Sequence, residues 1–292
     1  IPCCIIIVIN LLDRTIKGLS SLETTTSLPI IGTIIHNRYS ETIPVKSKPK
    51  SSIAESFRGI RSNLPFFLKN RFNTNTIAIT STISGEGKSF CALNTAAILS
   101  MLNKKTLIIG LDLRKPRLAE MLNISNNIGV TTHLIGRDSL DDVIMPTGIP
   151  NLDVIVAGPV PPNPAELIES KAFTDFLNNC KQKKYDYIIL DTPPIGLVTD
   201  TISISQFADC NIFVMRQNYT NVESITLVNS LAKEKQMKNL CVLLNDVTNT
   251  RTGYNGYTNY NKNNNGYYTE EEDHEDHKKT ILKRIFRKRH NG

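Results

Sequence analysis

The chain has 292 residues, 40% of them hydrophobic and 21% charged, which is ordinary for a soluble globular protein and allows one large α/β domain or two small ones. Its net charge of +7 lies largely near the two ends, which favours an anionic membrane surface at least as well as nucleic acid, and we expect no nucleic-acid partner. The six cysteines show no CxxC pair and no Cys/His ligand spacing, which argues against a zinc site and a disulfide framework. They are typical of buried small hydrophobes in a reducing cytosol.

Residues 1–52 are predicted to be the end of a transmembrane segment followed by a linker. The opening stretch IPCCIIIVIN, residues 1–10, is too short to span a bilayer and lacks the basic start of a signal peptide. Because charged residues follow at once, we interpret it as the cytoplasmic end of a transmembrane helix, with a buried strand as the alternative. Residues 27–37 form a short apolar stretch that ends in a loop, and residues 45–52 form a basic linker.

Residues 53–248 alternate between helical and strand-like patterns and form the predicted main domain. Helices are predicted from about Ile53 and at 87–102, 117–123, 164–183, 200–207 and 222–236. Strands are predicted at 76–81, 105–113, 151–158, 185–194, 210–217 and 240–247. Apolar strands separated by helices indicate an α/β fold with a mostly parallel central sheet and helices on both faces.

Residues 249–292 differ in composition and are predicted to be a disordered tail. Residues 251–268 are rich in Asn, Gly and Tyr and cannot bury a core. An acidic run and then a basic run follow, and the basic run places four apolar residues on one helical face: Ile281, Leu282, Ile285 and Phe286. Such a helix can lie on anionic lipid, and the alternative is a solvated tail that pairs with the acidic run.

The stretch TSTISGEGKS, residues 80–89, lies between a predicted strand and a predicted helix. A glycine-rich turn in this place lets backbone N–H groups approach a phosphate, and the helix N-terminus adds its positive end. Lys88 would reach the β- and γ-phosphates and the Ser89 hydroxyl would bind Mg²⁺. The pattern departs from GxxxxGK[ST] only at its first position, which is Thr82.

Two further strands end in carboxylates that suit such a loop. Asp191 follows an apolar strand and is expected at the carboxyl edge of the sheet, where a metal-holding acid belongs. A helix cap or turn is its alternative role. Asp112 ends another strand and could bind Mg²⁺ or accept a proton from an incoming hydroxyl. Its alternative is a salt bridge with Arg114 or Lys115.

Taken together, SGEGKS (84–89), LDLRKPRL (111–118) and IILDTPP (188–194) resemble the Walker A, A′ and B motifs of the bacterial tyrosine kinases, the BY-kinase family of capsule and exopolysaccharide export. GPVPPNPAELI (158–168) resembles a family loop and helix, and LLDRTIKG and SLPIIGTI resemble its juxtamembrane stretch. The resemblance covers nearly the whole chain except about the last twenty residues. It implies a P-loop NTPase fold and an ATP-dependent protein-tyrosine kinase that autophosphorylates its tail and regulates polysaccharide export.

The resemblance also implies roles for particular residues. The catalytic residues would be Lys88, Asp112 and Asp191, and the Mg²⁺ ligands Ser89, Asp112 and Asp191. ATP would be bound by Ser84, Gly85, Glu86, Gly87, Lys88, Ser89 and Phe90. The phosphate acceptors would be Tyr254, Tyr257, Tyr260, Tyr267 and Tyr268.

Partners and location are likewise implied by the resemblance. Glu55, Arg58 and Arg61 match an ExxRxxR helix used for ring assembly, which implies phosphorylation between copies of this chain. A solvated helix face is the alternative for the two arginines. A membrane polysaccharide co-polymerase segment, fused or separate, would place the kinase at the cytoplasmic face of the bacterial inner membrane.

Three positions depart from related patterns. Gly110 stands where the family has the first acid of DxDxR, and Ser84 stands where Pro is usual. The loss of that acid leaves an inactive nucleotide-binding scaffold as an alternative, although we still expect activity. Ile83 occupies the position of the signature lysine of partition ATPases, which argues against a partition-type ATPase switch.

Overall fold

A computed structural model describes residues 13–68, 74–195 and 200–248 of the chain. The predicted transmembrane end at residues 1–10 and the predicted tyrosine-rich tail lie outside these residues. No helix within the described ranges is both long and apolar enough to cross a membrane.

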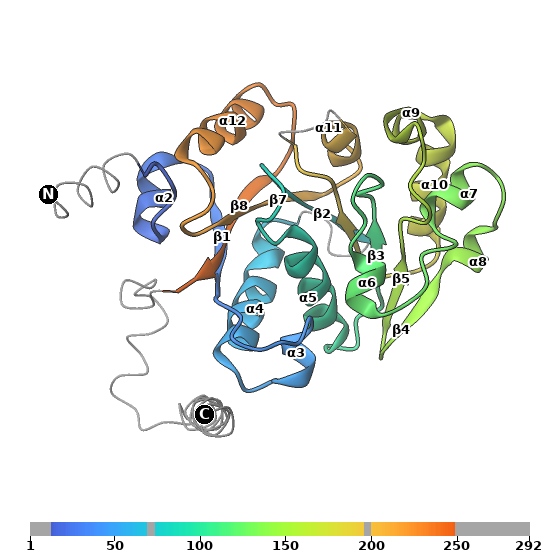
Figure 1. The fold of residues 1–292 in the computed structure, drawn as a ribbon, viewed down its shortest axis with the longest axis horizontal. Coiled ribbons are helices and arrows are strands. Elements are labelled where there is room, and N and C mark those ends of the chain that lie inside the picture. The colour runs from blue at the N-terminus through green and yellow to red at the C-terminus, as the bar shows by residue number, and fades with distance from the viewer. Residues whose placement is uncertain (1–12, 69–73, 196–199, 249–292) are drawn as a thin grey trace, which may run out of the picture.

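Eight strands of the described chain form one sheet, in the order β1-β8-β7-β2-β6-β3-β5-β4 (Figure 1). Their bounds are β1 Ile30–Ile35, β2 Asn75–Ser81, β3 Thr106–Gly110, β4 Met145–Ile149, β5 Leu152–Ile155, β6 Tyr187–Asp191, β7 Cys210–Arg216 and β8 Leu240–Val247. All neighbouring pairs are parallel except β4 with β5. The predicted α/β fold with a mostly parallel sheet is therefore confirmed.

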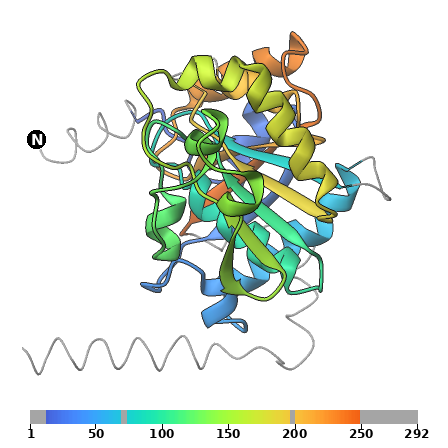
Figure 2. The ribbon, with the colours of Figure 1, turned by 90° about the vertical axis from the view of Figure 1, so that its right-hand side faces the viewer.

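Helices cover both faces of the sheet (Figure 2). One face carries α3 Pro44–Ser47, α4 Ser52–Asn63, α5 Lys88–Ser100 and α6 Leu118–Leu122, with the 3₁₀ turn η1 Leu64–Phe66 after α4. The other face carries α2 Leu19–Thr25, α7 Val130–Leu134, α8 Leu140–Val143, α9 Pro164–Glu169, α10 Lys171–Gln182, α11 Asp200–Ser205 and α12 Val222–Lys233. The predicted helix 164–183 is thus two helices, because Ser170 caps α10 by accepting a hydrogen bond from Phe173 N–H.

Alternate residues of each central strand point to opposite faces, as a parallel sheet with two buried faces requires. Ile77 and Ile79 of β2 pack under α4 and α5, whereas Ala78 between them packs on the opposite side. In β7, Ile212 packs under α4 and α5 and Phe213 packs under α12. The apolar runs in the sequence therefore reflect strands that are buried on both sides.

Two strands were not expected from the sequence. β1 lies in the stretch assigned to the N-terminal segment, but it pairs with β8 and buries Ile31 and Ile34, so the sheet begins before residue 53. β4 contains Pro and Gly and covers the other edge of the sheet as an antiparallel strand. Both are edge strands, where an interrupted or short pattern is tolerated.

The four cysteines within the described residues, Cys91, Cys180, Cys210 and Cys241, are free and buried, which confirms the prediction for them. Burial raises the pKa of Cys180 to about 12 despite nearby Lys183, so this thiol stays protonated at neutral pH.

Candidate functional site

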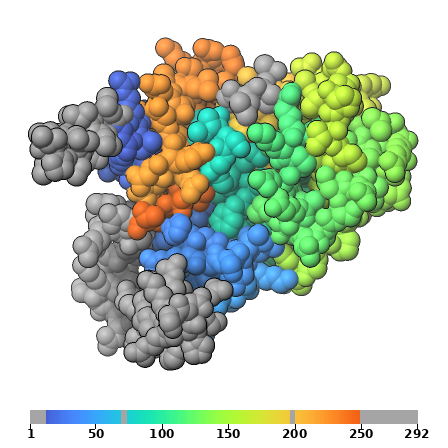
Figure 3. Space-filling view, viewed as in Figure 1, coloured from blue at the N-terminus to red at the C-terminus, as the bar shows by residue number. Residues whose placement is uncertain are grey.

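The loop between β2 and α5 lies at the carboxyl edge of the sheet, where ligands bind in open α/β folds. The space-filling view shows this region at the surface between the segment after β7 and the segment after β3 (Figure 3). Gly85 and Gly87 both have φ of +93°, which favours glycine. A Cβ on Gly85 would lie 2.5 Å from the Tyr219 hydroxyl oxygen, and one on Gly87 would overlap Asn245 Nδ2. The close approach of neighbouring side chains therefore also requires these glycines.

Helix α5 begins at Lys88 and continues this loop into the core. Nearly all of its residues are buried, so packing fixes its position under β2, β3 and β6. Its first N–H groups and its dipole face the loop and favour an anion there. Phe90 stacks its ring edge-on to Phe57 at 5.9 Å between centroids, so only its backbone is available to a phosphate.

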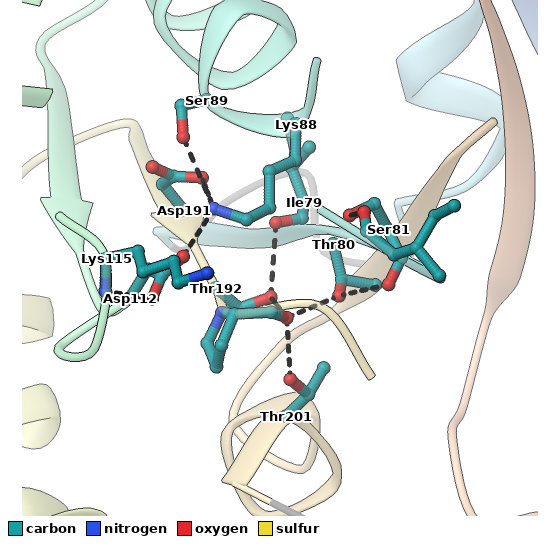
Figure 4. Close-up of polar contacts among 12 residues, drawn as sticks. Ile79, Thr80, Ser81, Lys88, Ser89, Asp112, Lys115, Asp191, Thr192 and Thr201 are labelled. Atoms are coloured by element: carbon teal, nitrogen blue, oxygen red, sulfur yellow. Dashed lines mark hydrogen bonds and ion pairs between the residues drawn. The ribbon is translucent and has the colours of Figure 1, made fainter. Parts of the chain in front are cut away.

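Lys88, Asp112 and Asp191 meet at this edge (Figure 4). Lys88 Nζ lies 2.8 Å from Asp112 Oδ2 and 3.7 Å from Asp191 Oδ1, and it donates a hydrogen bond to Ser89 Oγ at 3.4 Å. All four side chains are buried. The structure thus brings together the residues that the sequence predicted for catalysis and metal binding.

Burial opposes the charged forms of the side chains in this cluster, and this affects their pKa values. Burial alone would lower the pKa of Lys88, but the charges of Asp191 and Asp112 raise it above its ordinary value. Burial raises the pKa of Asp191, although the Lys88 charge opposes this. Asp191 Oδ1 is buried and accepts no hydrogen bond from the described residues. An additional cation at this oxygen would therefore be favourable.

Asp112 is oriented by the segment that follows it. The backbone N–H of Lys115 donates to Asp112 Oδ1 at 3.0 Å, and the other carboxylate oxygen faces Lys88. Arg114 pairs instead with the buried Asp200, at 3.1 Å. The alternative of a salt bridge between Asp112 and Arg114 is therefore wrong for this structure.

The segment that ends β6 is held by hydrogen bonds to β2 and to α11 (Figure 4). Thr192 N–H donates to the Ile79 carbonyl at 3.1 Å. The hydroxyls of Thr80 and Thr201 both donate to the Pro193 carbonyl, at 2.9 Å and 2.8 Å. These bonds hold the strand end that presents Asp191.

Gly110 is the register partner of Asp191 on the adjacent strand β3. A Cβ here would lie 3.3 Å from Ala157 N and 3.4 Å from Leu118 Cδ1. The position is therefore close to the metal-binding candidates but crowded, which fits a glycine in this chain.

The sequence predicted Glu86 as an ATP-binding residue but did not reveal what its side chain does within the loop. Its carboxylate is fully buried and accepts hydrogen bonds from Thr82 N–H at 2.7 Å, from Ile83 N–H at 2.9 Å and from the hydroxyls of Thr82 and Thr220. Burial raises the pKa of Glu86, against the effect of these bonds. The Glu86 carboxylate therefore shapes the loop from inside, and the prediction of ATP binding at this residue concerns its backbone.

Arg216, Tyr219 and Asn245 were also missed, although all three contact the loop backbone. Arg216 is the last residue of β7, Tyr219 follows that strand, and Asn245 lies near the carboxyl end of β8. The rule that placed Asp191 at this edge would have found Arg216 and Asn245, had it been applied to polar residues at every strand end.

The predicted assembly residues lie together on α4. Arg58 pairs with Glu55 and also donates to the Pro49 carbonyl, and Arg61 donates to the Ile98 carbonyl at 3.4 Å. Their side chains thus make contacts within one chain. The five tail tyrosines lie outside the described residues.

Comparisons with known proteins agree with this geometry. A family model described as an AAA domain matches residues 74–240. The chain is 33% identical over 223 residues to the tyrosine-protein kinase CpsD of Streptococcus agalactiae, covering 76% of this chain and 96% of that protein. It is 32% identical over 221 residues to the tyrosine-protein kinase YwqD of Bacillus subtilis, covering 76% and 92%.

A longer relative also matches. The tyrosine-protein kinase ptk of Acinetobacter johnsonii is 34% identical over 257 residues, which cover 84% of this chain and 35% of ptk. The chain thus spans about a third of the length of this relative.

Solved structures of similar fold include a tyrosine kinase domain. The chimerical protein CapA2B2 matches with a TM-score of 0.73 and 36% identity, covering 80% of this chain and all of that one. The kinase domain of the Escherichia coli tyrosine kinase ETK matches with a TM-score of 0.72 and 26% identity, covering 81% and 96%. The P-loop fold is therefore confirmed, and a partition-type ATPase is not favoured. This chain belongs to the family of bacterial tyrosine-protein kinases.

Proposed function

We propose that this chain transfers the γ-phosphoryl group of ATP to tyrosines of its own tail, and that it thereby regulates capsular or exopolysaccharide biosynthesis and export. The observation that carries the proposal is the placement of Lys88 between Asp112 and Asp191 at the start of α5. Names of relatives, all tyrosine-protein kinases, support the reaction class.

ATP fits the loop because its phosphates would replace the carboxylates as partners of Lys88. The loop from Ser84 to Ser89 offers backbone N–H groups, and α5 offers its N-terminus. Arrival of a triphosphate would draw the Lys88 ammonium from Asp112 toward the β- and γ-phosphates, which frees the Asp112 carboxylate.

Mg²⁺ fits the oxygen donors of Ser89, Asp112 and Asp191. Within the described ranges no group of three or more His, Cys, Asp or Glu side chains is placed to hold a metal ion, and Mg²⁺ does not need one. It is commonly held by one or two carboxylates together with water and substrate phosphates. The buried Asp191 Oδ1, which accepts no hydrogen bond within this part of the chain, suits this use. When bound, Mg²⁺ would neutralise charge on the transferring phosphoryl group.

In the reaction, the phenol oxygen of a tyrosine bonds to the γ-phosphorus while the bond from this phosphorus to the β,γ-bridging oxygen breaks and ADP leaves. The phenolic proton passes to the Asp112 carboxylate, which the Lys115 N–H and the sheet edge hold in place. Lys88 offsets the negative charge on the transferring group, and positioning supplies most of the remaining acceleration.

The acceptors in this proposal are Tyr254, Tyr257, Tyr260, Tyr267 and Tyr268. The Asn- and Gly-rich spacing between them suits a tail that must reach an adjacent active site. Each phosphotyrosine adds about −1.5 to −2 charges, so we propose that repeated phosphorylation separates the copies and cycles polymer export.

Assembly would use α4, where Glu55, Arg58 and Arg61 would exchange partners with a neighbouring copy to build a ring. The location proposed is the cytoplasmic face of the inner membrane, beside a co-polymerase segment. The name of the chimerical protein CapA2B2 and the length of ptk support a larger assembly of this kind.

A mixing experiment tests transfer between copies. Lys88→Met full-length chain is the acceptor, and a full-length chain with all five tail tyrosines changed to Phe is the donor. We expect phosphotyrosine on the Lys88→Met chain only when both proteins and Mg·ATP are present. Wild-type chain that labels itself, combined with an unlabelled Lys88→Met chain in the mixture, would contradict transfer between copies.

A further inference from the structure

Three consecutive carbonyl oxygens of the phosphate loop accept hydrogen bonds from side chains on the β7 and β8 side. The donors are Tyr219 Oη to the Ser84 oxygen at 2.9 Å, Arg216 Nη1 to the Gly85 oxygen at 3.1 Å and Asn245 Nδ2 to the Glu86 oxygen at 2.9 Å. We name these three donors the carbonyl clamp. It reaches the loop from sequence positions more than 130 residues away.

The clamp dictates where the loop N–H groups point. In a planar trans peptide the N–H of one residue is opposite to the carbonyl of the residue before it. The described residues contain no cis peptide bond. Carbonyls of residues 84–86 that face the clamp therefore turn the N–H groups of Gly85, Glu86 and Gly87 to the opposite side. The N–H groups of Gly85 and Gly87 donate no hydrogen bond to the described chain, so they remain available for an anion.

The clamp residues are themselves held in place. Arg216 Nε donates to Asp246 Oδ2 at 2.7 Å, and the Arg216 guanidinium lies over the Tyr219 ring at 5.2 Å from its centroid. The segment between β7 and α12, which carries Tyr219, is fixed by two backbone bonds: Ile16 N–H donates to the Thr220 carbonyl and Asn218 N–H donates to the Ile16 carbonyl. A donor set that is rigid before the ligand arrives lowers the ordering cost of binding.

We propose that Arg216, Tyr219 and Asn245 are positioning residues that set the affinity of the loop for a triphosphate. This inference rests on the proposed function, because it deepens the role of the same loop. The clamp acts on the backbone behind the loop and lies on the side away from Asp112 and Asp191. Its loss therefore weakens triphosphate binding and raises the KM for ATP, while kcat changes little.

Tyr219→Phe tests this most cleanly, because it removes one hydroxyl from a side chain that is 43% exposed and keeps the ring. Binding of two probes to the full-length chain is measured by calorimetry: a non-hydrolysable ATP analogue with Mg²⁺, and inorganic tripolyphosphate with Mg²⁺. We expect Kd to rise about fivefold for both probes, the effect of one hydrogen bond. Tyr187→Phe, at the opposite end of β6 from Asp191, is the matched control and should leave both Kd values unchanged.

The two probes separate the proposal from its competitors. Unchanged affinity for both probes in Tyr219→Phe would overturn the clamp. Weaker binding of the ATP analogue with unchanged binding of tripolyphosphate would also overturn it, because Tyr219 would then contact the nucleoside. Wild-type chain that binds neither probe would instead overturn the proposed function, and the clamp with it.

Discussion

On the side of the phosphate loop that faces β3 and β6, contacts are made between charges; on the side that faces β7 and β8, they are mostly hydrogen bonds to backbone carbonyls. Lys88 is shared between two buried carboxylates, and Asp191 Oδ1 lacks a hydrogen bond from the described residues. Tyr219 and Asn245 instead make single bonds of 2.9 Å to the loop backbone. Incomplete pairing suits groups that must exchange partners with a ligand, whereas complete pairing suits groups that only hold geometry.

The largest effect is expected on the charged side, from Asp112→Asn. The amide cannot take up the phenolic proton, so the rate of tyrosine phosphorylation should fall about 10²- to 10⁴-fold. The affinity for ATP, measured with a fluorescent ATP analogue, should fall far less. Asp141→Asn, an exposed carboxylate paired with Lys183, is the control. A phosphorylation rate within threefold of wild type would show that Asp112 does not accept the phenolic proton.

Gly87→Ala should have the next largest effect and tests the side of the loop that faces β7 and β8. A left-handed alanine costs about 1–2 kcal/mol, and its Cβ would also displace Asn245 from the loop. ATP affinity should therefore fall at least about tenfold. Gly136→Ala is a matched control, because Gly136 also has positive φ but has open space around it. Equal ATP affinity in the Gly87 and Gly136 variants would show that the loop tolerates displacement of Asn245.

The cost of burying the Asp191 carboxylate should be measurable in the pH dependence of the free energy of unfolding. Since burial raises the pKa of Asp191 above 3.8, the folded chain binds this proton more tightly than the unfolded chain does. The free energy of unfolding should therefore fall as pH rises from about 4 through the folded pKa, by up to about 1.4 kcal/mol per pH unit for this group.

Asp191→Asn should lose this contribution and show a shallower decline. Glu86, whose pKa is also raised, remains in both proteins and cancels in the comparison. Urea unfolding between pH 4 and 7 without nucleotide measures the difference. Parallel curves for the two proteins would mean that Asp191 is not destabilised by its burial.

The smallest effect on activity is expected from Gly110→Asp, which places a carboxylate on β3 opposite Asp191. Crowding by Ala157 and Leu118 should lower stability by about 1–3 kcal/mol. The added carboxylate, beside Asp191 in register, should lower the Mg²⁺ concentration for half-maximal activity about threefold. An unchanged Mg²⁺ requirement would show that this position does not reach the metal.

The sequence predicted the contacts on the β3 and β6 side of the loop better than those on the β7 and β8 side, for a physical reason. Asp112 and Asp191 end continuous apolar strands, so the strand pattern alone places them at one edge of the sheet. The partners of Glu86 depend on which strands become neighbours. Thr220 is 134 residues away from it in sequence, and no local pattern encodes that distance.

The prediction of strands was limited in the same way, because edge strands depend on partners that are distant in sequence. The central strands were predicted because burial on both faces makes them continuously apolar. β1 was recognised only as an apolar stretch, since its partner β8 lies some 200 residues later. β4, with the sequence MPTGI, alternates in burial and carries two residues that disfavour strands.

We propose above all that the site formed by Lys88, Asp112 and Asp191 transfers a phosphoryl group from ATP to tyrosine. Its most direct test is incubation of the purified chain with Mg·[γ-³²P]ATP, followed by phosphoamino-acid analysis and peptide mapping. We predict label on tyrosine, confined to peptides between residues 251 and 268, and none in Lys88→Met. Release of inorganic phosphate without any labelled tyrosine in the wild-type chain would contradict the claim.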